Sequence, residues 1–218
     1  MSAWKWDYAF SILPTLLKGV WVTIQLTALS LALALAMGLL LAIARMSPIK
    51  AVSRAAGMFI EFVRSTPLLI QLYFIYYVGP EFGLVLSPFL TGIIGLGLHY
   101  SAYTAEVYRA GIANVQQGQW EAARSLNLGT FATWRDIILP QAVAAVVAPL
   151  GNYALSMFKE TPILIGISVV ELLGEAQKLS STTYRYLEPL TIAGLFFFAL
   201  SYPTSKLIRY IDRRISKS

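Results

Sequence analysis

The chain has 218 residues, of which 57% are hydrophobic and only 13% are charged. Soluble domains carry about 25% charged residues and need polar cover on their surface, so this composition excludes an ordinary soluble enzyme or DNA-binding domain. In so apolar a chain, the net charge of +6 indicates basic loops beside a membrane rather than nucleic-acid binding. The chain has no cysteine and one histidine, which excludes disulfides, thiolate sites and histidine-clustered metal sites.

Five long apolar stretches predict an all-α, polytopic membrane protein with five transmembrane helices. A helix needs about 20 residues to cross the hydrocarbon core of a bilayer. We expect the spans at 19–44, 55–80, 82–108, 137–158 and 189–208. The whole chain, 1–218, is then one membrane domain.

Residues 1–18 precede the first span and predict a short helix on the membrane surface, because aromatic and leucine side chains are mixed with lysines. Five spans place the two termini on opposite sides. Eleven of the 17 Lys and Arg residues lie in the 45–54 loop, the 109–136 loop and the C-terminal tail. Five lie on the other side, and Arg64 lies within a span. The positive-inside rule therefore predicts an outer N-terminus and a cytoplasmic C-terminus.

The loop at 114–136 contains the most specific motif. We expect a short helix over 119–126, with Glu121 in its first turn, where a carboxylate suits the helix dipole. Ala122 and Ala123 would leave a smooth face for a partner surface. The alternative is an ordinary amphipathic connector that packs on the lipid or the bundle.

This loop resembles the EAA loop of ABC-importer permease subunits, in which Glu-Ala-Ala is followed at fixed spacing by Gly, Ile and Leu-Pro. Asn127 stands where the family has glycine, and we expect the turn to survive because asparagine also tolerates a positive φ. In that family the loop helix docks into a groove of a separate ATPase subunit. The resemblance thus implies seven coupling residues, namely Glu121, Ala122, Ala123, Asn127, Ile137, Leu139 and Pro140.

Segments 19–27, 62–77 and 101–112 are similar to further blocks of the polar amino acid permeases. This resemblance implies the fold of a type I ABC-importer permease in a bacterial inner membrane. It implies three protein partners: an ATPase that binds ATP and Mg, a second permease subunit (identical or paralogous) and an extracytoplasmic solute-binding protein. We expect no cofactor on this chain and no nucleic-acid partner, and the chain lacks a Gly-x-x-x-x-Gly-Lys-Ser/Thr loop for nucleotide.

Ionisable residues inside spans are costly and are candidates for function. Glu61 and Arg64 lie three residues apart on one helical face, as do Glu106 and Arg109. We expect two neutralised pairs that fix helix packing, with substrate contact as the alternative. We expect His99 to form an interhelical hydrogen bond rather than to relay protons.

Breaks in the spans indicate the substrate route, because irregular backbone in transporters lines water-filled paths. We expect Pro67 to interrupt the second span, and Pro149 with Gly151–Asn152 to break the fourth. Lys159 and Glu160 would close the fourth span as a local charge pair. The candidate pathway residues are Ser65, Thr66, Pro67, Tyr100, Asn152, Tyr153, Lys159 and Glu160.

Tyr153 directly follows the Gly-Asn pair, where many relatives have an acid. Because the fourth span then offers no carboxylate to a cationic side chain, we expect a zwitterionic substrate rather than arginine, lysine or histidine. Tyr73, Tyr76 or Tyr100 would offer a π face to its ammonium group. Farther along, Ser168-Val-Val-Glu171 has the spacing of a capping box and predicts a short outer helix, which either faces a delivery protein or only packs the loop.

These features favour the pore-forming subunit of an ATP-driven, receptor-dependent importer of amino acids or similar small solutes, with no catalytic residue. The alternative is a self-sufficient secondary transporter or channel, which would leave the EAA pattern unexplained. An intramembrane enzyme is disfavoured because the chain has no His-Glu-x-x-His element and its three aspartates lie outside the spans.

Overall fold

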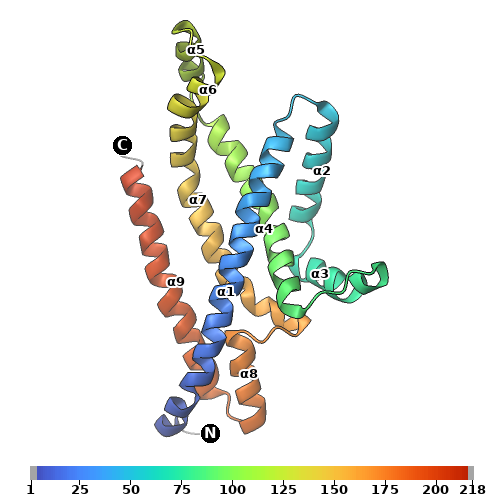
Figure 1. The fold of residues 1–218 in the computed structure, drawn as a ribbon. Helices are drawn as coiled ribbons and strands as arrows, with labels where there is room; N and C mark the ends of the chain where they lie inside the picture. The colour runs from blue at the N-terminus through green and yellow to red at the C-terminus, as the bar shows by residue number, and fades with distance from the viewer. Residues whose placement is uncertain (1–3, 216–218) are drawn as a thin grey trace.

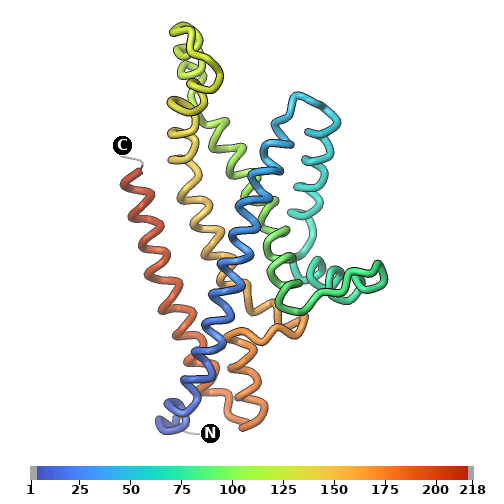
Figure 2. The backbone as a smooth tube through the Cα atoms, viewed as in Figure 1, coloured from blue at the N-terminus to red at the C-terminus, as the bar shows by residue number. Residues whose placement is uncertain are grey.

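The computed structural model describes residues 4–215, which form helices and connecting loops and contain no strand. Helix α1 (Trp6–Arg45) is one continuous helix of 40 residues, about 60 Å long at 1.5 Å per residue. Residues 6–18 are therefore the first turns of α1 rather than a separate helix. Only the dark-blue end of the tube turns away from the axis of the rest (Figure 2).

The second expected span is not one straight helix. Helix α2 (Lys50–Ser65) ends before Pro67, and α3 (Leu68–Tyr73) continues through a π-helical turn, η1 (Phe74–Val78), into η2 (Gly79–Phe82). The two parts meet at 105°, so the second part leaves the bundle sideways (Figure 1). Pro67 causes the break because it lacks an N–H group and holds the preceding residue in extended geometry.

Helix α4 (Pro88–Ala113) lies against α1 and α7 in the bundle, and the coupling loop follows it. The loop contains α5 (Gln117–Ser125), α6 (Thr130–Ala132) and the π-helical η3 (Thr133–Ile138), which leads into α7 (Leu139–Glu160). The expected break at Pro149 and Gly151–Asn152 is wrong, because α7 runs through both without interruption. Bundle helices tolerate a proline where neighbouring groups compensate for the one lost hydrogen bond.

After α7 come the 3-10 helix η4 (Thr161–Ile167), the short helix α8 (Leu172–Thr183) and the last helix α9 (Leu187–Ile215). The expected short helix is present, but the expected capping box is absent from its start. Ser168 has a φ of 65° and ends η4. Glu171 itself caps α8, because its carboxylate accepts a hydrogen bond of 3.0 Å from the Gly174 N–H.

Small residues let α1 and α4 approach closely. Ser30, Ala34, Gly38 and Ala42 recur every four residues on the buried face of α1. A Cβ atom on Gly38 would overlap the Thr104 hydroxyl group, which donates a hydrogen bond of 2.9 Å to the Ala34 carbonyl. Close backbone approach of this kind is typical of helix packing in membranes.

Three helical stretches are long and apolar enough to cross a membrane: α1, the run from Thr130 to Ile167, and α9. The bent pair of α2 and Leu68–Phe82 would make a fourth span. The third expected span, 82–108, corresponds to α4, which is long enough with 26 residues. Glycine, serine, threonine and histidine residues lower the mean hydropathy of α4. The structure accommodates them because they are buried against other helices.

Candidate functional site: a polar face and the coupling helix

The break at Pro67 is stabilised by the Thr66 hydroxyl group and by the side chain of Gln71. Its amide nitrogen lies 2.8 Å from the Val63 carbonyl oxygen and 3.1 Å from that of Thr66. The Thr66 hydroxyl donates to the Phe62 carbonyl at 3.0 Å. Carbonyl groups left without helical partners at the break are thereby satisfied, which explains how a membrane protein keeps such a bend.

Gln71 also joins the break to α4. Its amide oxygen lies 3.1 Å from Nδ1 of His99, which is only 8% exposed. This contact is the interhelical hydrogen bond expected for His99. The sequence analysis did not predict Gln71 as the partner of His99, although a polar residue four positions after Pro67 was a signal for such a contact.

Three tyrosines form a cluster beside His99. Tyr100, Tyr103 and Tyr153 have ring centroids between 5.5 and 6.0 Å apart. The Tyr100 hydroxyl donates a hydrogen bond of 2.8 Å to the Glu160 carboxylate. The structure thus brings together three candidate pathway residues, namely Tyr100, Tyr153 and Glu160. It adds Tyr103, which lies three residues after Tyr100 on the same helix and could have been predicted from that spacing.

Other candidate pathway residues lie outside this cluster. Asn152 is exposed and forms no side-chain hydrogen bond with the residues at 4–215. Lys159 is also exposed, and the expected charge pair with Glu160 is wrong, because no ion pair joins these two described residues. Tyr73 and Tyr76 pack on Tyr77 instead, with centroid distances of 5.5 and 4.9 Å.

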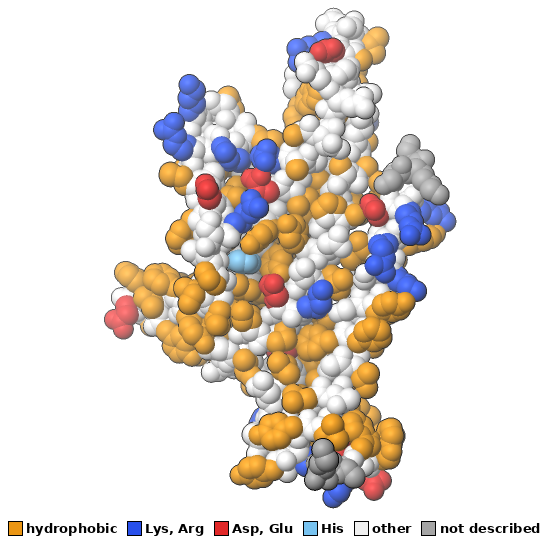
Figure 3. Space-filling model, turned by 180° about the vertical axis from the view of Figure 1, so that it is seen from behind, with side chains coloured by type: hydrophobic (Ala, Val, Ile, Leu, Met, Phe, Trp, Pro, Cys, Tyr) orange, Lys and Arg blue, Asp and Glu red, His pale blue; other side chains and the backbone are white. Residues whose placement is uncertain are grey.

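The two expected Glu–Arg pairs differ. Glu106 accepts two hydrogen bonds from Arg109, at 2.7 and 3.0 Å. No ion pair joins Glu61 and Arg64, although the structure describes both, so their expected neutralisation is wrong. The Arg64 guanidinium instead lies 5.3 Å from the centre of the Tyr103 ring. We call the group of Glu61, Arg64, His99, Tyr103 and Glu106 the polar face, and Figure 3 shows charged side chains and the histidine on this side of the molecule.

The coupling helix α5 ends as the sequence predicts. Asn127 has a φ of 52°. Its N–H donates to the Arg124 carbonyl at 2.9 Å, and the Leu128 N–H donates to the Ala123 carbonyl at 3.0 Å. These two bonds form a Schellman motif, so asparagine performs here the conformational task of a glycine.

Two expectations about α5 are wrong. Glu121 lies in the middle of the helix, because α5 starts at Gln117. Ala123 is fully buried and therefore faces inward, whereas Ala122 is exposed. The inner side is filled by Trp120 and Trp134, whose rings pack edge to face at 5.4 Å.

The other residues of the motif divide between the two sides of the loop. Glu121, Asn127, Leu139 and Pro140 are exposed, and Ile137 is half-buried. Ile137 packs against the small core of Val115, Ile138 and Ala142. The motif therefore combines a rigid attachment to α7 with an exposed helix tip.

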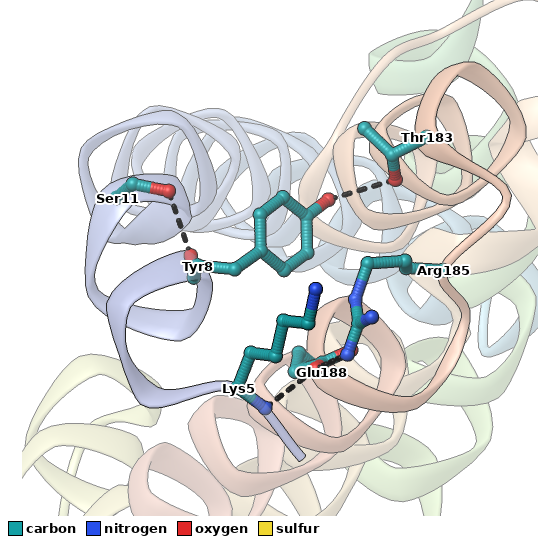
Figure 4. A network of polar contacts seen from close by, with 6 residues as sticks. All are labelled: Lys5, Tyr8, Ser11, Thr183, Arg185 and Glu188. Atoms are coloured by element: carbon teal, nitrogen blue, oxygen red, sulfur yellow. Dashed lines mark hydrogen bonds and ion pairs between the residues drawn. The ribbon is translucent and has the colours of Figure 1, made fainter. Parts of the chain in front are cut away.

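A second polar network closes the opposite end of the bundle, where the chain begins (Figure 4). Glu188 is fully buried, pairs with Arg185 and accepts a hydrogen bond of 3.0 Å from the Lys5 N–H. Tyr8 bonds Thr183 at 2.9 Å. The hydrogen bond from Arg185 lowers the pKa of Glu188 from its ordinary value of 4.5 to about 2.

Residues 34–217 match the family of binding-protein-dependent transport system inner membrane components. The chain belongs to this family. It is 42% identical over 210 residues to the probable amino-acid ABC transporter permease protein y4tG of Sinorhizobium fredii, covering 96% of this chain and 91% of that protein. It is 34% identical over 222 residues to the L-cystine transport system permease protein TcyB of Bacillus subtilis, covering 99% and 95%.

A solved structure of an amino acid ABC transporter with histidines superimposes with a TM-score of 0.92 and 37% identity, covering 98% of this chain and all of that chain. The inward-facing methionine transporter MetNI, at 19% identity and a TM-score of 0.65, supports the fold alone. The chain is therefore an inner-membrane transport subunit rather than an enzyme. The family implies an ATPase subunit, a substrate-binding protein and a second permease as partners.

Proposed function

We propose that this permease imports amino acids or similar small zwitterions, with its N-terminus outside and its C-terminus in the cytoplasm. The single observation that supports coupling most strongly is the exposed tip of α5, held by the Schellman motif at Asn127. Large apolar side chains surround this tip, with Leu126 71% and Phe131 76% exposed. An exposed apolar tip on a rigid helix suits a groove on a partner protein.

The orientation rests on the distribution of basic residues. The end of the bundle that contains α5 also contains the turn between α1 and α2 and the end of α9 (Figure 1). Arg45, Lys50 and Arg54 lie at this turn, and Arg213 and Arg214 lie in the last turn of α9. By the positive-inside rule, this end faces the cytoplasm and the ATPase.

The substrate class rests on the polar face and on the relatives. Similar permeases are named for glutamine, cystine and nopaline. In this chain, the half-buried Tyr103 and Tyr153 present aromatic surface next to the buried Tyr100, which binds the Glu160 carboxylate. Such a layer suits the ammonium group of a zwitterion. The second permease subunit, identical or paralogous, would complete the path.

ATP and Mg²⁺ belong to the partner ATPase in this proposal. The chain has no phosphate-binding Gly-x-x-x-x-Gly-Lys-Ser/Thr loop. Within residues 4–215, no group of three or more His, Asp or Glu side chains could hold a metal ion.

The test compares Asn127→Val with Asn127→Gly in the transporter reconstituted with its ATPase and receptor. A β-branched residue at positive φ is strained, so we expect the valine variant to lose ATP-driven uptake and the glycine variant to keep it. Glu121→Lys should also abolish uptake while the complex still forms. Full uptake by Asn127→Val would contradict the coupling role, and uptake without the ATPase would favour a secondary transporter.

The orientation has its own test. A reporter active only in the cytoplasm should work when it is fused after Ser218 and fail when it is inserted in the loop at 83–87. The reverse result would contradict both the orientation and the ATPase contact.

A further inference from the structure

A cavity of about 420 Å³ lies on the polar face between the three-tyrosine cluster and the turn that joins α1 to α2. Its volume falls in the range of about 300–1,000 Å³ that is typical of small-molecule sites. Two walls come from α2 and α4, and Arg45 at the end of α1 closes the third side. The lining residues used below are Arg45, Gly57, Glu61, Arg64, Ser65 and Tyr103.

The charges around this cavity are unequally neutralised. Glu106 also lines it, but Arg109 compensates its carboxylate through two hydrogen bonds. Glu61 and Arg64 form no ion pair with any residue between 4 and 215. One carboxylate and one guanidinium therefore face the same cavity without being joined.

Packing explains why Arg64 does not pair with Glu61. The Arg64 guanidinium lies over the Tyr103 ring on α4, which draws it away from the Glu61 side of α2. The second guanidinium, that of Arg45, is fixed against α2 by a hydrogen bond of 3.0 Å from its Nη1 to the Ser53 hydroxyl. A Cβ atom on Gly57 would lie 3.0 Å from the Arg45 Cζ atom, so glycine permits this close approach.

We propose that this cavity is an inner binding site for the charged backbone of an amino acid, with the carboxylate toward Arg64 and the ammonium toward Glu61. This inference rests on the proposed function and names the site that substrate occupies after it passes the tyrosine cluster. A zwitterion supplies one partner to each open charge. A further cation is disfavoured because Arg45 and Arg64 together outnumber the one uncompensated carboxylate.

The first experiment measures receptor-dependent uptake and ATP hydrolysis by the reconstituted transporter. The probe is the substrate that wild type takes up fastest among the twenty standard amino acids, cystine and nopaline; no uptake of any of them would refute the proposed function itself. Glu61→Gln and Arg64→Gln should each lower uptake at least about tenfold, the effect of one lost charge-assisted contact, while ATP hydrolysis continues. Arg209→Gln and Asp212→Asn are matched controls, because these residues are also three apart but lie exposed on α9, outside the cavity.

Uptake by Glu61→Gln and Arg64→Gln at the level of the controls would overturn the inner site. Joint loss of uptake, ATP hydrolysis and complex formation would indicate a structural role and would also overturn it, unless the second experiment finds protection. Because the chain has no natural cysteine, Ser65→Cys places one thiol in the cavity.

The second experiment labels this thiol in the purified complex with a charged methanethiosulfonate reagent. The transported amino acid should slow labelling, whereas the corresponding amine without a carboxylate and the corresponding acid without an ammonium should not. Asn114→Cys, which lines a different cavity, is the control and should be labelled at one rate throughout. Equal labelling of Ser65→Cys with and without the amino acid would overturn the proposal.

Discussion

Two regions of the molecule place acidic and basic side chains three residues apart and use them differently. At the end of the bundle where α1 begins, Arg185 pairs with Glu188, and the buried Glu188 carboxylate also accepts a hydrogen bond from the Lys5 backbone N–H (Figure 4). On the polar face, between α2 and α4, Glu61 and Arg64 face a cavity without pairing. The paired charges of Arg185 and Glu188 stabilise the fold, whereas the unpaired charges of Glu61 and Arg64 can each bind a group of a ligand.

The largest effect on stability should come from the contact between α1 and α8. Glu171 caps α8 and also accepts a hydrogen bond of 3.1 Å from Thr23 on α1. Glu171→Leu removes the cap and leaves buried donors without an acceptor, so we expect the free energy of unfolding to fall by about 3 kcal/mol. Denaturant titration of the solubilised protein measures this. Glu175→Leu, on the same helix, is the control, and equal loss in both variants would contradict the capping role.

A second prediction concerns Gln71, whose side chain joins the break at Pro67 to α4. Gln71→Leu leaves the Val63 and Thr66 carbonyls and His99 without their partner, so we expect a loss of about 2 kcal/mol. Gln141→Leu removes a single exposed bond to the Ile137 carbonyl and should cost under about 1 kcal/mol. The same unfolding measurement distinguishes them, and indistinguishable variants would show that the bend does not depend on Gln71.

A smaller effect is expected at the tyrosine cluster. Tyr100→Phe removes the hydrogen bond to Glu160. Because this bond is only partly buried, we expect the free energy of unfolding to fall by about 1 kcal/mol. Tyr103→Phe keeps the ring contacts and removes a hydroxyl that has no hydrogen-bond partner within 4–215, so its stability should equal that of wild type. A larger loss in Tyr103→Phe than in Tyr100→Phe would reverse this assignment.

The last prediction concerns the dependence of stability on pH at the network of Arg185 and Glu188. The folded-state pKa of Glu188 is lowered from 4.5 to about 2, so its ionised form stabilises the fold above pH 4.5. That contribution is lost as the pH falls from 4.5 toward 2. The difference in melting temperature between wild type and Glu188→Gln should therefore be constant from pH 8 to 5 and shrink below it. A difference that grows on acidification would contradict the sign.

Sequence reasoning reached the fold class, the family and the coupling loop because these depend on local pattern. Apolar runs predict helices that cross a bilayer, and Asn127 adopts its left-handed geometry from its own backbone preferences. The predictions were wrong where the outcome depends on contacts with neighbouring helices. Both prolines were expected to break a helix, but only Pro67 does, while α7 continues through Pro149.

The amino-acid sequence by itself determined that this chain is a helical membrane permease with an exposed coupling helix, since periodicity, length and a spaced motif are properties of neighbouring residues. Only the tertiary structure decided which charges pair. Arg64 and Glu61 are close enough in sequence to join, yet Tyr103 from another helix holds the guanidinium away. The Glu171 carboxylate likewise accepts a hydrogen bond from Thr23, although 148 positions separate the two residues in the chain. Such partners come together only when the helices pack, so no local pattern reveals them.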